Sequence, residues 1–207
     1  KHPVGIGNLG NTCFLNCCLQ IIYQCPIIFN IIKDNAKRNS LNTACPEILV
    51  LKNLYNLWDT NNKNNVCLPK GLISSINDLA KYKKRENMQV GIYQNDFAEF
   101  LLFLIECIHV CVCTKDNSFA VCAFTDKKVS YLEKKSKEML VKFYKNDYSK
   151  IYDIFYGISM MTICSNDSKI IYSTVPELFF TIDLCIDKSC MTLYDCLDKH
   201  TGIEYMC

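Results

Sequence analysis

Near its start the chain reads Gly7-Asn8-Leu9-Gly10-Asn11-Thr12-Cys13-Phe14-Leu15-Asn16, a glycine-containing loop that leads into an apolar run. The two glycines allow tight backbone turns, and Asn11 or Thr12 can cap a helix whose first turn contains Cys13. The positive end of a helix dipole stabilises a thiolate there, and the Asn8 side-chain amide can donate a hydrogen bond to an oxyanion. The loop therefore predicts acyl-transfer chemistry, with Cys13 as the catalytic nucleophile and Asn8 as an oxyanion donor.

Residues 5–20 closely resemble the cysteine box of the ubiquitin-specific proteases, whose pattern is Gly-Leu-x-Asn-x-Gly-x-Thr-Cys-Tyr/Phe-Met/Leu-Asn-x-x-Leu-Gln. An ordinary cysteine at a helix start is more often a buried packing residue than a nucleophile. The match at nearly every fixed position favours the nucleophile. The resemblance implies a thiol-dependent deubiquitinase that cleaves the peptide or isopeptide bond after the C-terminal glycine of ubiquitin. Its partners would be ubiquitin and ubiquitinated proteins.

Composition limits the other classes of function. With 207 residues, of which 50% are hydrophobic, the chain can bury a sizeable core in one domain or two subdomains. A formal net charge of +2 does not indicate a nucleic-acid partner. No stretch reaches the ~18 consecutive apolar residues of a membrane span. Because the sequence begins Lys1-His2-Pro3 rather than with methionine, we expect it to be part of a longer protein.

Cysteine usage indicates a reducing compartment. The chain has 15 cysteines, an odd number with scattered spacing, which favours free thiols over a disulfide framework. We therefore expect a cytoplasmic or nuclear protein. Several cysteines lie in apolar runs, where a reduced thiol packs as a small core residue, namely Cys17, Cys18, Cys107, Cys111 and Cys122.

Apolar residues recur at helical spacing through the first 148 residues. The pattern predicts helices over 13–25, from Pro46 through Trp58, from Pro69 through Leu79, over 96–112 and between 127 and 144. It stops at Pro26, and the asparagine-rich residues 61–65 are predicted to form a loop.

Beyond residue 149 the composition changes to isoleucine, phenylalanine, tyrosine and threonine, which favours strands. Strands are predicted over 154–164, 169–174 and 178–186, with a turn at 165–168 and a short helix over 192–199 capped by Thr192. A helical part followed by strands predicts an α+β fold.

The family resemblance sharpens this fold. Ubiquitin-specific proteases have a papain-like hand fold, in which a helical thumb carries the cysteine and β-rich palm and fingers follow. The resemblance implies a helical thumb-like subdomain over 1–148 and the truncated start of the fingers or palm over 149–207. Only the first half of the hand is then expected in these residues.

A second box runs from Gln94 to Leu101 and resembles the family pattern Gln-Gln-Asp-Ala-x-Glu-Phe-Leu, with Asn95 in place of the second glutamine. From the residues alone, Asp96 and Glu99 can form an acidic capping box at a helix start. The resemblance implies instead that Gln94, Asp96 and Glu99 bind the basic C-terminal tail of ubiquitin. Both interpretations stay open, and one residue could serve both purposes.

Residues 149–157 also resemble the family, in the pattern Ser-x-Ile-x-Asp-x-Phe-x-Gly that leads into the fingers. The family commonly continues with Cys-x-x-Cys, but here Cys164 is followed by Ser165, Asn166 and Asp167. The matching second pair would begin at Cys207. Because structural zinc takes four ligands, we expect no zinc and no other cofactor.

None of the three histidines, His2, His109 and His200, suits the role of general base. In the family the base comes from a box far downstream, so we expect the catalytic histidine to lie outside this chain. Two alternatives remain. One is a catalytically inactive ubiquitin-binding or scaffold module. The other, a cysteine-rich metal-binding domain, is weakened by the lack of a complete pair of Cys-x-x-Cys motifs.

Overall fold

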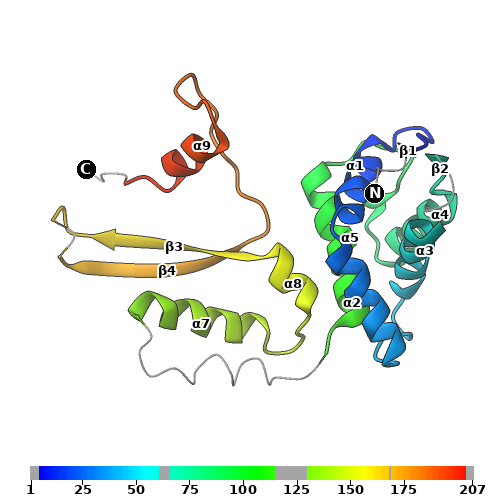
Figure 1. Cartoon of the computed structure of the whole chain (residues 1–207), viewed down its shortest axis with the longest axis horizontal. Coiled ribbons are helices and arrows are strands. Elements are labelled where there is room, and N and C mark those ends of the chain that lie inside the picture. The colour runs from blue at the N-terminus through cyan, green and yellow to red at the C-terminus, as the bar shows by residue number, and fades with distance from the viewer. Residues whose placement is uncertain (1–4, 61–65, 115–129, 168, 204–207) are drawn as a thin grey trace.

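The computed structural model describes residues 5–60, 66–114, 130–167 and 169–203. The described helices are α1 (Cys13–Tyr23), α2 (Pro26–Lys37), α3 (Ile48–Thr60), α4 (Lys70–Tyr82), the 3-10 helix η1 (Glu86–Met88), α5 (Phe97–Val112), α7 (Tyr131–Phe143), α8 (Lys150–Phe155) and α9 (Leu193–His200). The described strands are β1 (Gly5–Ile6), β2 (Val66–Cys67), β3 (Gly157–Cys164) and β4 (Ile171–Phe179). Helices α1 to α5 gather into one cluster, and the β3–β4 hairpin extends away from it (Figure 1).

Helix α5 lies in the middle of the helical cluster because it is apolar around most of its circumference. Its buried residues include Phe100 and Leu104, which are both fully buried. Helix α1 packs on it through a face that contains Phe14, Leu15 and Leu19. The rings of Phe14 and Phe100 meet edge to face, with centroids 4.7 Å apart. This contact fixes the axis of the helix that begins at Cys13.

The helices expected in the first part of the chain are confirmed at α1, α3, α4 and α5, and α7 confirms the described part of the one expected between 127 and 144. Helix α2 was missed, because Pro26 ends the periodicity of α1. Proline is compatible with the first turn of a helix, and Pro26 begins α2. Phe29 of α2 then stacks on Trp58 of α3, with ring centroids 4.2 Å apart. Residues 61–65, the expected loop, lie outside the described residues.

No single described helix is long and apolar enough to cross a membrane. Helices α1 and α2 pass that test of length and hydropathy only as a pair, with a 76° bend between them. Their apolar faces, which include Leu19 and Ile28, are buried in the core.

The expected strands are confirmed in type and corrected in their limits. Residues 154–155 belong to α8, so β3 begins later, at Gly157. A single strand, β4, replaces the two strands expected over 169–174 and 178–186, and residues 180–186 form no strand. Pro176 does not interrupt β4, since a proline is tolerated in a strand at the edge of a sheet.

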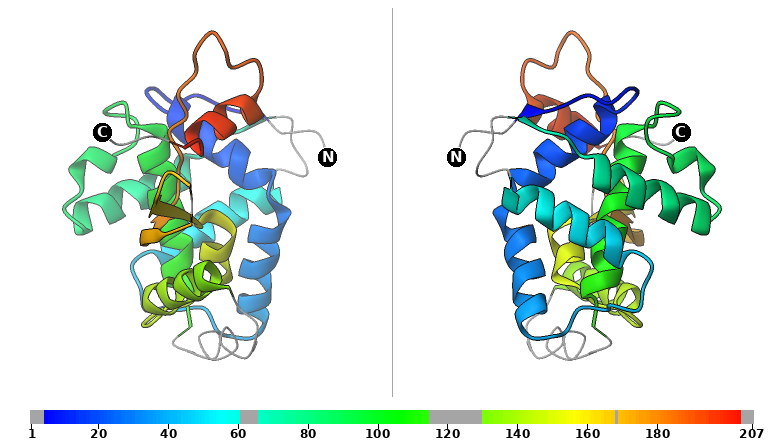
Figure 2. Two further views of the ribbon diagram at one scale, coloured as in Figure 1. Left: turned by 90° about the vertical axis from the view of Figure 1, so that its left-hand side faces the viewer. Right: turned by 90° about the vertical axis from the view of Figure 1, so that its right-hand side faces the viewer.

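Helix α7 covers one face of the hairpin, and α9 lies on its opposite side (Figure 1, Figure 2). Ser136 of α7 contacts the Met160 sulfur across this interface, at 3.4 Å. On the other face, Met161 and Val175 stand opposite each other and are 60% and 47% exposed. The hairpin is therefore packed on one face only within the described part of the chain.

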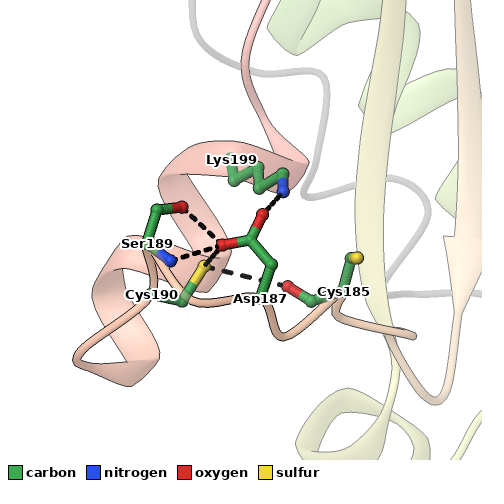
Figure 3. A network of polar contacts seen from close by, with 5 residues as sticks. All are labelled: Cys185, Asp187, Ser189, Cys190 and Lys199. Carbon is green, nitrogen blue, oxygen red and sulfur yellow. Dashed lines mark hydrogen bonds and ion pairs between the residues drawn. The ribbon is translucent and has the colours of Figure 1, made fainter.

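Helix α9 is anchored by the loop that precedes it. Thr192 caps the helix, as expected, in a capping box with Asp195. Asp187 accepts hydrogen bonds from the Ser189 amide and hydroxyl and pairs with Lys199 on α9 (Figure 3). The Lys199 ammonium is the main reason that the pKa of the Asp187 carboxyl is well below its usual value. These contacts hold the loop in a compact turn and join it to α9.

The expected free thiols are confirmed for the cysteines that the structure describes, none of which is in a disulfide. Cys18, Cys107 and Cys111 are buried, and burial raises the pKa of both Cys18 and Cys107 to about 12. The expectation was wrong for Cys17, which is exposed because it falls on the opposite side of α1. Cys122 lies outside the described residues.

Helix α8 joins the hairpin to the helical cluster through a buried histidine. The Ser149 side chain caps α8 and lies 2.7 Å from His109 Nδ1 on α5. The His109 ring also stacks on Tyr152, with centroids 3.7 Å apart. Burial lowers the pKa of His109 to about 4, although the nearby Asp147 carboxylate opposes this shift. His109 is therefore a neutral packing residue.

This buried histidine makes stability depend on pH. Unfolded His109 takes up a proton below its usual pKa of 6.5, whereas folded His109 stays neutral down to about pH 4. Acid therefore favours the unfolded chain, and we expect a loss of about 2 kcal/mol between about pH 7 and about pH 5. Urea unfolding at the two pH values measures it. His109→Gln should reduce the loss and the exposed-site control His200→Gln should retain it; equal losses in all three proteins would contradict the assignment.

Candidate active site

The loop before α1 is fixed at its entry by a short parallel pair of strands. Gly5 and Ile6 of β1 pair with β2, and the Gly7 amide donates to the Cys67 carbonyl at 2.8 Å. A Cβ atom on Gly7 would approach the Leu68 side chain to 2.4 Å. A side chain on Gly7 would therefore require the Leu68 side chain to move.

The tip of the same loop is fixed by a second segment, residues 90–93. Gly10 has φ +104°, a conformation that favours glycine, and Gly91 opposite it has φ +90°. Asn11 pairs with Gly91, and its side-chain amide donates to the Ile92 carbonyl at 3.4 Å. Segments far apart in the sequence therefore set the shape of the loop.

Cys13 lies in the first turn of a helix, as predicted: α1 begins at this residue, and Thr12 occupies the N-cap position. The first helical hydrogen bond runs from the Asn16 amide to the Thr12 carbonyl, at 2.9 Å. Cys13 is exposed, so the alternative of a buried packing cysteine is wrong for this residue. The thiol therefore stands at the accessible N-terminus of a helix whose other side is embedded in the core.

Asn8 lies at the surface, beside the helix start. Its Oδ1 atom accepts a hydrogen bond of 2.6 Å from the Thr12 hydroxyl. With Oδ1 engaged in this way, Nδ2 is the atom of the amide that can donate to a ligand. The structure thus brings Asn8 into contact with Thr12, the residue that precedes Cys13, and the oxyanion role of Asn8 stays a prediction.

The three residues expected to bind substrate, Gln94, Asp96 and Glu99, are all exposed around the N-terminus of α5. Asp96 caps this helix by accepting a 2.9 Å hydrogen bond from the Glu99 amide. This confirms one half of the expected capping box. In α7 and α9 both halves of the capping box form. In α5 the described side-chain cap is the bond to Asp96.

An open hollow of about 590 Å³ lies between α1 and the start of α5, lined by Ile6, Asn16, Cys17, Gln20, Ile21 and Phe97. Cys17 is one helical turn beyond Cys13 and on the same side of α1. The Cys18 thiol, on the buried side, contacts the Phe97 carbonyl at 3.7 Å. The nucleophile candidate and the second box therefore belong to one packed unit.

Two asparagines near this hollow were not singled out by sequence reasoning. Asn16 Oδ1 and Asn95 Nδ2 are buried, and neither has a hydrogen-bond partner among the described residues. Their signal in the sequence was present, since Asn16 is a fixed position of the cysteine box and Asn95 replaces a glutamine of the second box. Buried amide atoms normally find partners, so both are candidates for contacts with a ligand or further chain.

No group of three or more histidine, cysteine or acidic side chains able to bind a metal ion occurs in the described ranges. Cys164 is exposed at the end of β3, and Asp167 accepts hydrogen bonds from Ser165 and Lys169 in the turn that follows. Cys207, the other expected remnant of a zinc site, lies outside the described residues.

The described histidines do not complete the site. His109 is enclosed between α5 and α8, and its Nδ1 atom lies against Ser149. His200 is exposed at the end of α9, and His2 lies outside the described residues.

Comparison with known proteins shows the family of the chain. The sequence profile of the family described as ubiquitin carboxyl-terminal hydrolase matches residues 4–184. The chain is 28% identical over 211 residues to ubiquitin carboxyl-terminal hydrolase 2 of Rattus norvegicus and equally to that of Homo sapiens, with 95% of this chain and 32% of each relative covered. Ubiquitin carboxyl-terminal hydrolase 23 of Arabidopsis thaliana is 27% identical over 113 residues, or 54% of this chain and 12% of the relative.

The chain thus spans about a third of the length of the hydrolase 2 relatives that it matches. The family match includes the loop before α1, the second box and both strands of the hairpin. Since it covers most of the chain, this protein belongs to the ubiquitin carboxyl-terminal hydrolase family.

Proposed function

We propose that this chain carries the nucleophile of a thiol-dependent deubiquitinase, which cleaves the peptide or isopeptide bond after the C-terminal glycine of ubiquitin. The observation that carries the proposal is the exposed Cys13 at the N-terminus of α1, beside the oriented amide of Asn8. Membership of the ubiquitin carboxyl-terminal hydrolase family supports the same chemistry.

The site supports an acyl transfer through a thioester. The Cys13 thiolate attacks the carbonyl carbon of the scissile bond, and the electron pair of the carbonyl moves to its oxygen. Asn8 Nδ2 and the Cys13 backbone amide, which has no partner within the helix, donate to that oxyanion. Each such donor lowers the barrier by on the order of 3 kcal/mol. The amine then leaves with a proton, and water hydrolyses the thioester.

The proton transfers need a general base that we place outside these residues. His109 is buried with a pKa lowered to about 4, so it is a poor proton acceptor near neutral pH. A histidine with an orienting aspartate or asparagine, supplied by further chain, would complete the triad. The relatives are about three times as long as the matched region, which leaves room for such a segment.

The proposed fold of the whole catalytic domain is the papain-like hand. The helical cluster of α1 to α5 corresponds to a thumb that carries Cys13, within residues 1–148. Residues 149–207, with the β3–β4 hairpin, correspond to the start of the fingers or palm. The half-covered hairpin and the separation of helices from strands support this assignment (Figure 1).

Gln94, Asp96 and Glu99 are proposed to bind the basic tail of ubiquitin. All three are exposed at the start of α5, which packs on the helix of Cys13. The Asp96 carboxylate caps α5 through Oδ1, which leaves Oδ2 to accept a bond from a basic side chain. We further propose a cytoplasmic or nuclear protein that acts on ubiquitinated proteins, without a cofactor and without a nucleic-acid or membrane partner.

A second candidate function is a ubiquitin-binding scaffold without catalysis. The enclosure of His109 favours it, because this histidine is committed to packing against Ser149 and Tyr152. The two candidates differ in one requirement only, the supply of a base by further chain.

Labelling with a ubiquitin that bears a C-terminal electrophile tests Cys13. We expect the full-length protein to be labelled and Cys13→Ala to abolish labelling. Cys17→Ala is the matched control, since Cys17 is also exposed and lies one turn along α1. It should retain labelling, because the thiol at the helix start is the better-placed nucleophile. Labelling that persists in Cys13→Ala would assign the chemistry to another cysteine.

Hydrolysis by residues 1–207 alone tests the missing base. Without proton transfer we expect the rate on a fluorogenic ubiquitin substrate to be about 10²- to 10⁴-fold below that of the full-length protein. Equal rates would show that a histidine of this chain acts as base. A full-length protein that binds ubiquitin but does not hydrolyse this substrate would support the scaffold.

The substitution Asp96→Asn separates substrate binding from helix capping. Asparagine caps a helix well, so stability should change little, whereas a charge-assisted contact with a basic tail would be lost. We expect ubiquitin affinity to fall, and the loss to shrink at high salt. Calorimetry on the full-length protein at two salt concentrations measures it, with Asp34→Asn on the exposed side of α2 as control. Equal affinities at low salt would leave Asp96 as a cap only.

A further inference from the structure

The Thr12 side chain does not cap the helix at whose N-cap it stands. Elsewhere in the chain the polar N-caps Asp96, Ser130, Ser149 and Thr192 each accept a hydrogen bond from the amide three residues on. No such bond forms from the Thr12 side chain to α1. The Thr12 side chain is completely buried, although Asn8 and Cys13 on either side are exposed. Because the buried Thr12 hydroxyl does not cap α1, it must find its hydrogen-bond partners elsewhere.

The hydroxyl is instead the middle member of a short chain of hydrogen bonds. Thr12 Oγ1 accepts from the Leu9 amide at 3.1 Å and donates to Asn8 Oδ1 at 2.6 Å. A hydroxyl has one proton, and the Leu9 amide can only donate. The 2.6 Å separation is typical of an O–H···O bond and short for an N–H···O bond. The Thr12 proton therefore goes to an oxygen, which fixes the orientation of the Asn8 amide.

The direction of this chain decides what the Asn8 amide can offer. With Oδ1 bound to Thr12, the Nδ2 group is directed away from Thr12 and remains a donor. A flipped amide would offer its oxygen instead, and an amide oxygen repels an oxyanion. The unused first-turn amides of α1 remain available in addition, because the Thr12 side chain does not occupy them.

We propose that Thr12 is a positioning residue that holds Asn8 as a hydrogen-bond donor for the oxyanion formed on attack by Cys13. The inference rests on the proposed function and deepens it. Thr12 contacts neither the substrate nor the reacting sulfur through its hydroxyl; it acts through Asn8. Removal of the Thr12 hydroxyl should therefore slow the reaction as removal of the Asn8 amide does, but by a smaller factor, and substrate binding should be retained.

Two reactions of the full-length protein separate positioning from structure. The first is hydrolysis of a fluorogenic ubiquitin amide, which passes through an oxyanion. The second is labelling by ubiquitin with a C-terminal propargyl amide. In this labelling the Cys13 sulfur adds to the alkyne, a proton goes to the other alkyne carbon, and a thioether forms without any oxyanion. Only the first reaction needs the donor on Asn8.

The variants are Thr12→Val, which keeps the shape and removes the hydroxyl, Thr12→Ser, which restores it, and Asn8→Ala. We expect Thr12→Val to lower kcat about 10- to 100-fold, below the 10²- to 10³-fold expected for loss of an oxyanion donor in Asn8→Ala. KM and the labelling rate should stay within about twofold, since binding and the thiolate are unaffected. Thr12→Ser should recover most of kcat. The double variant of Thr12→Val with Asn8→Ala should be no slower than Asn8→Ala alone, because both substitutions remove the same hydrogen bond to the oxyanion.

Several results would overturn the inference. An unchanged kcat in Thr12→Val would do so, as would a parallel fall of labelling and hydrolysis, which indicates a disturbed helix start. Thermal unfolding shows whether Thr12→Val is folded. If it is not, Thr12→Ala and the double variant of Thr12→Ala with Asn8→Ala take its place in the same comparison. Failure of the proposed function is distinct: the wild type would then neither hydrolyse nor become labelled, or Asn8→Ala would keep full kcat. Either result removes the role of Thr12 as well.

Discussion

The packing of α1 on α5 is the contact on which the arrangement of the site depends. Phe14, Leu15 and Leu19 are almost fully withdrawn from water against the apolar α5, and the Phe14 and Phe100 rings meet at 4.7 Å. Burying side chains of this size contributes about 1.5–3 kcal/mol each. Because Cys13 is the first residue of α1, the same burial fixes where the thiol stands and leaves the opposite side of the helix accessible.

The loop before α1 needs a different kind of support, because it has no apolar face of its own. Backbone pairing supplies it: β1 lies beside β2, and Asn11 pairs with Gly91. Gly10 and Gly91 both adopt positive φ, so the two turns approach with little steric cost. The loop before α1 is thus held between residues 66–68 and 90–93, which are more than fifty positions away along the chain.

The connection to the hairpin shows how a family motif can have a mainly structural explanation. Ser149 caps α8 and contacts His109, while the Asp153 carboxylate accepts hydrogen bonds from Tyr144 and Tyr148, at 2.6 and 2.5 Å. A Cβ atom on Gly157 would meet the Phe179 ring at 2.3 Å. Each of these residues therefore has a packing or hydrogen-bonding reason at this junction, independent of any substrate.

Local chemistry in the sequence was enough to determine several features. One is the position of Cys13 in the first turn of α1, and two more are the helix caps of Asp96 and Thr192. Each depends on residues a few positions apart, so the printed sequence contains the interaction. Their spacing also carried the family resemblance, which the profile match confirmed.

Only the tertiary structure decided the features that depend on distant partners. Whether Cys17 faces solvent or the core depends on which side of α1 meets α5, and the periodicity of a nearly all-apolar helix does not specify it. Helix α2 is stabilised by the stacking of Phe29 on Trp58. It was not predicted, because the helical periodicity of the sequence stops at Pro26. The role of His109 depends on Ser149, forty residues away. The partner of the Thr12 hydroxyl is near in sequence, but the hydroxyl was expected only as a helix cap; the folded loop brings Asn8 Oδ1 within 2.6 Å of it instead.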